Sequence, residues 1–120
     1  MIPGTPAADA PVSGPRGSWL LDYLQDGFTL LAFGDAVPAE AIRALANDTH
    51  SCAVVRVGAP AAPGAVAIED AQGLLAKRYD AREHTCYLFR PDQHVCARWR
   101  SFDLGCVRAA VARATGQMLH

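Results

Sequence analysis

Two histidine–cysteine pairs have the same spacing in the sequence, His84 with Cys86 and His94 with Cys96. Imidazole nitrogens and thiolate sulfurs are ligands that zinc prefers, and a thiolate next to a cationic group can act as a nucleophile. The two pairs therefore raise the hypotheses of a metal centre and of a thiol site. The simpler interpretation is a β-hairpin with small buried thiols and exposed histidines.

The surrounding residues predict such a hairpin. Two runs rich in β-formers, TCYLFR at 85–90 and HVCARWR at 94–100, flank the turn residues Pro91-Asp92-Gln93, which is the pattern of two antiparallel strands. The expected cross-strand pairs are Phe89 with Val95, Leu88 with Cys96, Cys86 with Arg98, and His84 with Arg100. In this register the even-numbered residues of both strands, two arginines included, share one face.

This register argues against a metal centre. Cys86 and Cys96 would be diagonal neighbours, about 7 Å or more apart, which is near the upper limit for a disulfide. His84 and His94 would lie on the order of 20 Å apart along the ladder, whereas zinc ligands all lie within about 2.3 Å of one ion. Asp92, His94 and Cys96 do not form a catalytic trio either, because alternate residues of a strand point the same way without mutual contact.

The hairpin belongs to a longer series of elements. Apolar runs at 28–33 and 52–58 predict two buried strands. Apolar residues at helical spacing predict helices at 39–48 after Pro38, at 69–80, and at 104–117 after the capping residue Asp103, with residues 59–65 as a loop. Right-handed crossovers make the first two strands parallel neighbours, and the hairpin adds an antiparallel half. We therefore expect an α/β protein of the thioredoxin-like class, with helices on both faces of a mixed sheet.

The N-terminal segment has a different composition. Residues 1–17 contain four prolines and three glycines, which predicts an extended leader ahead of a domain at 18–120. Ser18 could cap a short helical turn at 19–24 that presents Trp19, Leu20, Tyr23 and Leu24 inward, and Asp26-Gly27 indicates a turn. The leader, with Ile2 and Val12, could lie along the edge of the sheet or across a second copy, and we expect a homodimer.

The sequence lacks the chemistry that a thioredoxin-like fold suggests. A thiol redox enzyme of this class needs Cys-x-x-Cys where the first strand meets its helix, and the junction at 33–41 contains no cysteine. The position ahead of the hairpin, usually a proline in that superfamily, is His84-Thr85. An independent protein that uses Cys52 or Cys106 for thiol redox or peroxide sensing remains the alternative.

Composition excludes several other classes. The formal net charge is −1, which gives no electrostatic reason to expect nucleic acid or an anionic membrane as a partner. Neither a signal peptide nor an apolar run of about 20 residues is present, so we expect a cytoplasmic chain with reduced cysteines. No GxGxxG or Walker-type motif occurs to hold phosphates.

Two stretches carry a family resemblance. The segment GSWLLDYLQDGFTLLAFGD, followed some sixty residues later by YLFRPDQHVCARWR, resembles the C-terminal domain of FAD-dependent aromatic hydroxylases. These are flavin monooxygenases of the phenol hydroxylase and 3-(3-hydroxyphenyl)propionate hydroxylase type. The resemblance covers essentially the whole chain, including the PG-PAADAPV lead-in. Cys96 departs from the pattern, which usually has alanine there.

The resemblance implies a non-catalytic accessory domain of similar fold, which packs on the flavin domain or supports dimer contacts. FAD and NAD(P)H are implied only for a parent enzyme, because the flavin machinery of the family lies upstream. Gly34-Asp35-Ala36 imitates a second family motif, but the His and Pro that should follow are misplaced. We therefore assign no catalytic, cofactor-binding or metal residue and expect no activity from the chain alone. Whether it is a fragment or a freestanding protein stays open.

Overall fold

The computed structural model describes residues 4–24 and 27–118, with side chains up to residue 116. Ile2 and Asp26, on which two expectations rested, lie outside the described residues. The elements in chain order are the 3-10 helix η1 (Leu20–Tyr23), β1 (Phe28–Phe33), α1 (Ala39–Asn47), β2 (Cys52–Val57), β3 (Ala65–Ile68), α2 (Leu74–Arg78), β4 (Cys86–Phe89), β5 (Val95–Trp99) and α3 (Leu104–Met118).

The strands form one mixed sheet in the order β3-β2-β1-β4-β5. β1 lies at the centre, parallel to β2 and antiparallel to β4, and the hairpin partner β5 forms one edge. All six residues of β1 are buried, as expected for an apolar strand covered on both faces. The predicted α/β arrangement of two parallel strands and an antiparallel hairpin is therefore confirmed.

The region between β2 and β4 differs from the prediction. A short strand, β3, pairs in parallel with β2 where the sequence analysis ended a loop, and α2 begins only at Leu74. The physical reason is local: Gly73 has a positive φ of 71°, a conformation that glycine adopts without steric cost. Asp70 then accepts hydrogen bonds from the backbone N–H groups of Leu75 and Ala76 at 3.0 and 2.9 Å. This capping starts the helix several residues later than its apolar spacing suggests.

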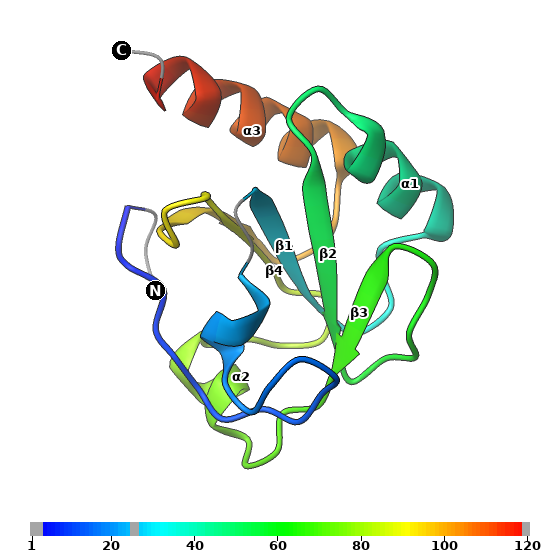
Figure 1. Ribbon diagram of the computed structural model, residues 1–120, viewed down its shortest axis with the longest axis vertical. Coiled ribbons are helices and arrows are strands. Elements are labelled where there is room, and N and C mark those ends of the chain that lie inside the picture. The colour runs from blue at the N-terminus through cyan, green and yellow to red at the C-terminus, as the bar shows by residue number, and fades with distance from the viewer. Residues whose placement is uncertain (1–3, 25–26, 119–120) are drawn as a thin grey trace.

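The sheet separates two apolar clusters. Helices α1 and α3 cover one face, as Figure 1 shows, and pack on the side chains of Leu30, Val54 and Leu88. The other face, which carries Leu31, Val55 and several aromatic residues, is covered by α2, η1 and the N-terminal segment. No helix in the described part of the chain is long and apolar enough to cross a membrane.

The N-terminal residues 4–17, here called the strap, pack against the second face. Figure 1 shows the strap running from the hairpin past α2 to the end of β3. It pairs with β5 through Gly4 N–H to the Val95 carbonyl (2.6 Å) and Val95 N–H to the Thr5 carbonyl (2.8 Å). At its other end, Ser13 and Glu69 exchange two backbone hydrogen bonds. Of the two arrangements considered for this segment, the structure has the one along the chain's own sheet.

The turn after the strap corrects one prediction. Leu20, Tyr23 and Leu24 are buried as expected, but half of the Trp19 side chain is exposed. Ser18 is not the capping residue. Instead, the Asp22 carboxylate accepts a hydrogen bond from the Trp19 N–H at 3.2 Å, so the turn begins one residue later and Trp19 points away from the core.

Candidate functional site

The place where a thioredoxin-like enzyme carries its thiols is the junction between β1 and α1. Here the chain turns at Gly34, whose φ is 95°, and its N–H donates to the Val57 carbonyl at 2.9 Å. From the segment that precedes β4, the His84 N–H donates to the Phe33 carbonyl at 2.7 Å. Asp35 is exposed and Val37 is buried. The junction therefore presents a carboxylate and an imidazole but no nucleophilic sulfur.

Thr85 occupies the position next to this junction. It is fully buried, and its hydroxyl accepts a hydrogen bond from the Arg82 N–H at 3.0 Å. The Thr85 N–H donates to the Arg82 carbonyl at 3.1 Å, a bond that a proline, which has no N–H, could not make. The residue thus closes a local turn and shapes no thiol site.

The hairpin places the two histidine–cysteine pairs differently from the prediction. Arg90 bonds with His94 and Phe89 pairs with Val95 as expected, but a β-bulge follows, so that Leu88 pairs with Ala97 and Cys86 with Trp99. A bulge puts two residues of one strand opposite one of the other.

The bulge moves the arginines relative to the cysteines. Cys86 and Cys96 belong to the face covered by α1 and α3. Arg98, expected on that face, instead lies over the Tyr87 ring at 5.3 Å on the opposite face. Arg98 and Arg100 both approach the Asp80 carboxylate there, at 3.8 and 3.5 Å. The predicted common face of cysteines and arginines is therefore wrong.

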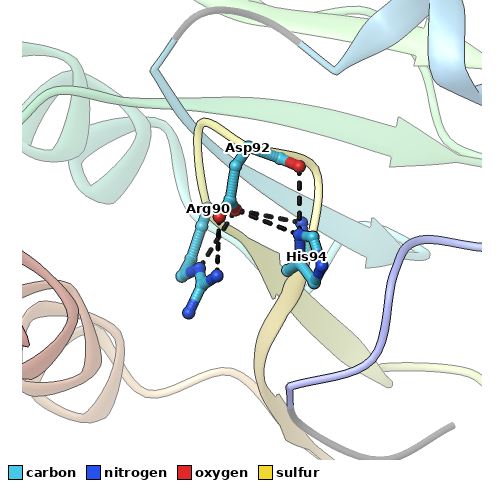
Figure 2. Close-up of polar contacts among 3 residues, drawn as sticks. All are labelled: Arg90, Asp92 and His94. Carbon is cyan, nitrogen blue, oxygen red and sulfur yellow. Dashed lines mark hydrogen bonds and ion pairs between the residues drawn. The ribbon is translucent and has the colours of Figure 1, made fainter. Parts of the chain in front are cut away.

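The turn of the hairpin holds the polar residues singled out by the sequence, as Figure 2 shows. The Arg90 guanidinium donates two hydrogen bonds to the Asp92 carboxylate, at 3.0 and 2.6 Å. The same carboxylate accepts from the His94 N–H at 3.3 Å, and the His94 ring Nδ1 lies 3.1 Å from the Asp92 carbonyl. These contacts stabilise the turn, with Gln93 at a φ of 64°, and Cys96 is not among them.

The two histidine–cysteine pairs do not gather around a common point. Of the trio Asp92, His94 and Cys96, the first two are in contact, contrary to the expectation from alternation along a strand, because Asp92 lies in the turn. Among the residues described, no group of three or more His, Cys, Asp or Glu side chains could hold a metal ion. The four cysteines are all unpaired, with Cys52 and Cys86 buried, Cys96 half-buried and Cys106 exposed. The Cys106 N–H donates to the Asp103 carboxylate at 3.0 Å, which confirms Asp103 as the cap of α3.

Burial makes the inner thiols poor nucleophiles. It raises the pKa of Cys52 to about 12 and that of Cys86 to about 11. Burial also raises the pKa of Cys96, although two neighbouring arginines, Arg90 and Arg113, act in the opposite direction. A thiol reacts as its thiolate, so these three side chains stay protonated and largely inert near neutral pH.

We expect alkylation to separate the four cysteines. In the folded protein at pH 7.5, iodoacetamide should modify Cys106 first and Cys96 more slowly, and it should leave Cys52 and Cys86 unmodified until the chain unfolds. Peptide mass spectrometry over a time course measures this order. Rapid modification of Cys52 in the native state would contradict the structure and favour the thiol redox alternative.

The same pKa values predict a loss of stability in alkali. A folded-state pKa above the unfolded value, here about 9, means that the unfolded chain releases the proton first. The stabilisation is therefore complete below pH 9 and decreases as the pH rises toward 11 for Cys86 and 12 for Cys52. Each thiol should contribute about 1.4 kcal/mol per pH unit in this window. Urea unfolding of wild type and Cys52→Ala between pH 8 and 11 tests it, because the variant should lose stability less steeply; identical slopes would exclude the effect.

The fold and the residues at the β1–α1 junction together define the structural class of the protein. The structure is a thioredoxin-like α/β domain, and the described residues hold no thiol at the β1–α1 junction. In agreement, the fold is similar to that of the lipoprotein thioredoxin Etrx1 from Streptococcus pneumoniae, with a TM-score of 0.59 and 13% identity over 88% of this chain and 99% of that one.

The most informative comparisons are with flavoenzymes. The chain is similar to a part of the flavin-dependent monooxygenase PieE, solved with FAD and substrate, with 30% identity and a TM-score of 0.72. It is also similar to a part of aklavinone-11 hydroxylase, solved with FAD and aklavinone, with 24% identity and a TM-score of 0.66. The matches cover 96% and 90% of this chain but only 20% of each enzyme. The resemblance to a domain of FAD-dependent monooxygenases, predicted from the motifs, is confirmed. No family model and no curated protein sequence matches the chain.

The sequence did not identify Arg113 as a candidate binding residue. Arg113 on α3 is exposed, and it lines a cavity together with Arg90 and Cys96. The signal in the sequence is weak, because it requires knowing that Ala110, three residues earlier on α3, lies against Cys96.

Proposed function

We propose that the chain is a non-catalytic accessory domain that docks on the flavin-binding domain of an FAD-dependent aromatic-compound monooxygenase. The observation that carries the proposal is the match to PieE, which includes 96% of this chain and a fifth of that enzyme at 30% identity. The described residues add indirect support, since Cys52 and Cys86 are buried and four arginines pair with aspartates, which suits a scaffold better than a reaction site. An independent thiol redox protein is the second candidate, and it would depend on Cys106, the exposed cysteine.

The strand-to-helix turn after β1 does not fit FAD. A dinucleotide site needs a glycine-rich turn that presents backbone N–H groups of a helix N-terminus to the pyrophosphate. Here the turn has one glycine, Gly34, followed by the exposed carboxylate of Asp35. Pro38 precedes α1 and supplies no N–H. The negative charge and the missing donor both oppose a bound phosphate, so the FAD of the proposed parent enzyme would be held by another domain.

We expect the isolated chain to bind no FAD and to oxidise no NAD(P)H. Equilibrium dialysis against FAD, followed by flavin fluorescence of the protein compartment, measures the first part. Saturable binding with a micromolar Kd would show that a flavin site exists in this chain and would overturn its assignment as an accessory domain.

A domain exchange tests docking. In PieE, the matched fifth of the chain would be replaced by residues 4–118 of this protein, and the FAD content of the purified chimera would be measured. The matched control replaces the same segment by Etrx1, which has a similar fold but only 13% identity to this chain. If the chain presents a docking surface for a flavin domain, its chimera should retain FAD and the control should retain much less. Equal FAD content in the two chimeras would count against a specific docking surface.

We also propose that the domain forms a homodimer at high concentration. Trp19 supports this, because it is a large hydrophobic side chain left half exposed, and such groups favour interfaces. Sedimentation equilibrium should show a dimer that Trp19→Ser weakens, whereas a monomeric mass at millimolar concentration would exclude it.

The free cysteines support a cytoplasmic location, since an oxidising compartment favours disulfides.

A further inference from the structure

A cavity of about 280 Å³ opens between the hairpin edge, the start of the strap and α3. Its volume is near the lower end of small-molecule sites. Two arginines and the half-buried Cys96 line it together with small apolar residues. The lining residues are Gly4, Arg90, Val95, Cys96, Ala110, Arg113 and Ala114.

The charges on this wall do not cancel. Arg90 is engaged by the Asp92 carboxylate through two hydrogen bonds, which fixes its position and neutralises most of its charge. Arg113 has no salt bridge among the described residues. Both cations are close enough to influence the Cys96 thiol electrostatically. The cavity therefore carries close to one uncompensated positive charge, and its two guanidinium groups lie near the same wall residue.

We propose that this cavity binds a small organic monocarboxylate, with Arg113 as the principal ligand of the carboxylate and Arg90 as a second, pre-positioned donor. The planar fork of a guanidinium matches the two oxygens of a carboxylate. Val95, Ala110 and Ala114 supply an apolar wall for the body of the ligand. A single uncompensated charge suits a monoanion better than a phosphate dianion. Binding of such a ligand goes beyond the proposed docking on a flavin domain.

Benzoate is a suitable probe, because it joins one carboxylate to a compact apolar ring, and benzamide is its neutral counterpart of similar shape. Each would be titrated into the 15N-labelled chain at constant ionic strength. Benzoate should shift the amide signals of Cys96, Ala110 and Arg113 in a saturable manner, and benzamide should bind at least tenfold more weakly. Equal binding of the two compounds, or shifts confined to other parts of the chain, would refute the site.

Two variants make the test specific. Arg113→Gln should weaken benzoate binding roughly tenfold or more. Arg43→Gln, which removes the same charge from an exposed position on α1 outside this cavity, should leave the affinity unchanged. Alkylation gives an independent readout, because saturating benzoate should slow the modification of Cys96 and leave Cys106 unaffected. Unchanged affinity in Arg113→Gln would show that Arg113 does not bind the carboxylate. An equal loss in Arg43→Gln would show that benzoate responds only to overall charge, and either result would refute the site.

Discussion

Deleting residues 1–17 should abolish the cooperative unfolding transition of the chain, although the composition of this segment is typical of a linker. The strap buries Ala10 completely and Val12 to 4% exposure. Burial of a valine side chain contributes about 1.5–3 kcal/mol. The deletion would also uncover the apolar face around Leu31 and Val55, against which the strap and η1 pack. A loss of about 5 kcal/mol or more would equal or exceed the free energy of unfolding of many small domains.

The strap is also bonded along its length. The Leu20 N–H donates to the Ala10 carbonyl at 3.0 Å, and the Val12 N–H donates to the Ser18 carbonyl at 2.9 Å. The Tyr23 hydroxyl closes the following loop, since it accepts from the N–H groups of Arg16 and Gly17 and donates to the Gly17 carbonyl. The truncated chain would leave the buried hydroxyl of Tyr23 without these partners, which adds to the cost.

Circular dichroism during urea unfolding measures the effect, and point variants separate burial from chain length. Val12→Asn should cost roughly 2–4 kcal/mol, because it places an amide without a partner in an apolar site. Ser13→Ala, at an exposed neighbouring position that bonds through its backbone, should change stability by less than about 0.5 kcal/mol. A truncated chain that unfolds cooperatively at nearly the wild-type urea midpoint would show that residues 18–120 fold alone.

Tyr79→Ala should be the most destabilising single substitution near the strap, at about 3–5 kcal/mol. The Tyr79 ring is fully buried and meets Tyr87 and Phe89 edge-on, with centroids 4.9 and 5.9 Å away. Its hydroxyl donates to the Ala8 carbonyl of the strap, and its own carbonyl accepts from the Tyr87 hydroxyl. The side chain therefore joins the sheet, the end of α2 and the strap.

A second variant isolates the contact with the strap. Tyr79→Phe keeps the ring and removes the bond to Ala8, so it should cost about 1 kcal/mol in the full chain. A chain that lacks residues 1–8 has already lost this partner, and Tyr79→Phe should cost much less there. Urea unfolding of the four proteins gives the coupling as a double-mutant cycle. An equal cost of Tyr79→Phe in both backgrounds would mean that the hydroxyl contributes nothing through the strap.

Elements with strong local patterns were predictable from the sequence. β1 is a continuous apolar run between turn residues, and α3 combines a capping aspartate with apolar residues at helical spacing. Both signals are local, and both predictions are confirmed. The start of α2 was not predictable from apolar spacing, because it depends on the left-handed Gly73 and on the Asp70 carboxylate. β3 has only four residues, and its pairing depends on the exposed edge of β2.

Features that depend on contacts between distant segments were harder to predict. At the bulge in the hairpin, Cys96 and Ala97 both pack against the apolar cluster that α1 and α3 cover, which no pattern within β5 indicates. The missing thiols at the β1–α1 junction were visible in the sequence, because a residue type is read directly. The cavity beside Arg113 could not be predicted from the sequence, because residues from the strap, the hairpin and α3 line it together.

We propose that this domain works as part of a flavin monooxygenase, either in the same chain or docked to it. An antibody raised against the chain, used on a native extract of the source cells separated by size, tests this claim most directly. The antibody signal should coincide with FAD absorbance and with NAD(P)H oxidation, in a species well above the 12.7 kDa of this chain. A signal at the mass of the free chain or of its homodimer, without flavin, would contradict it.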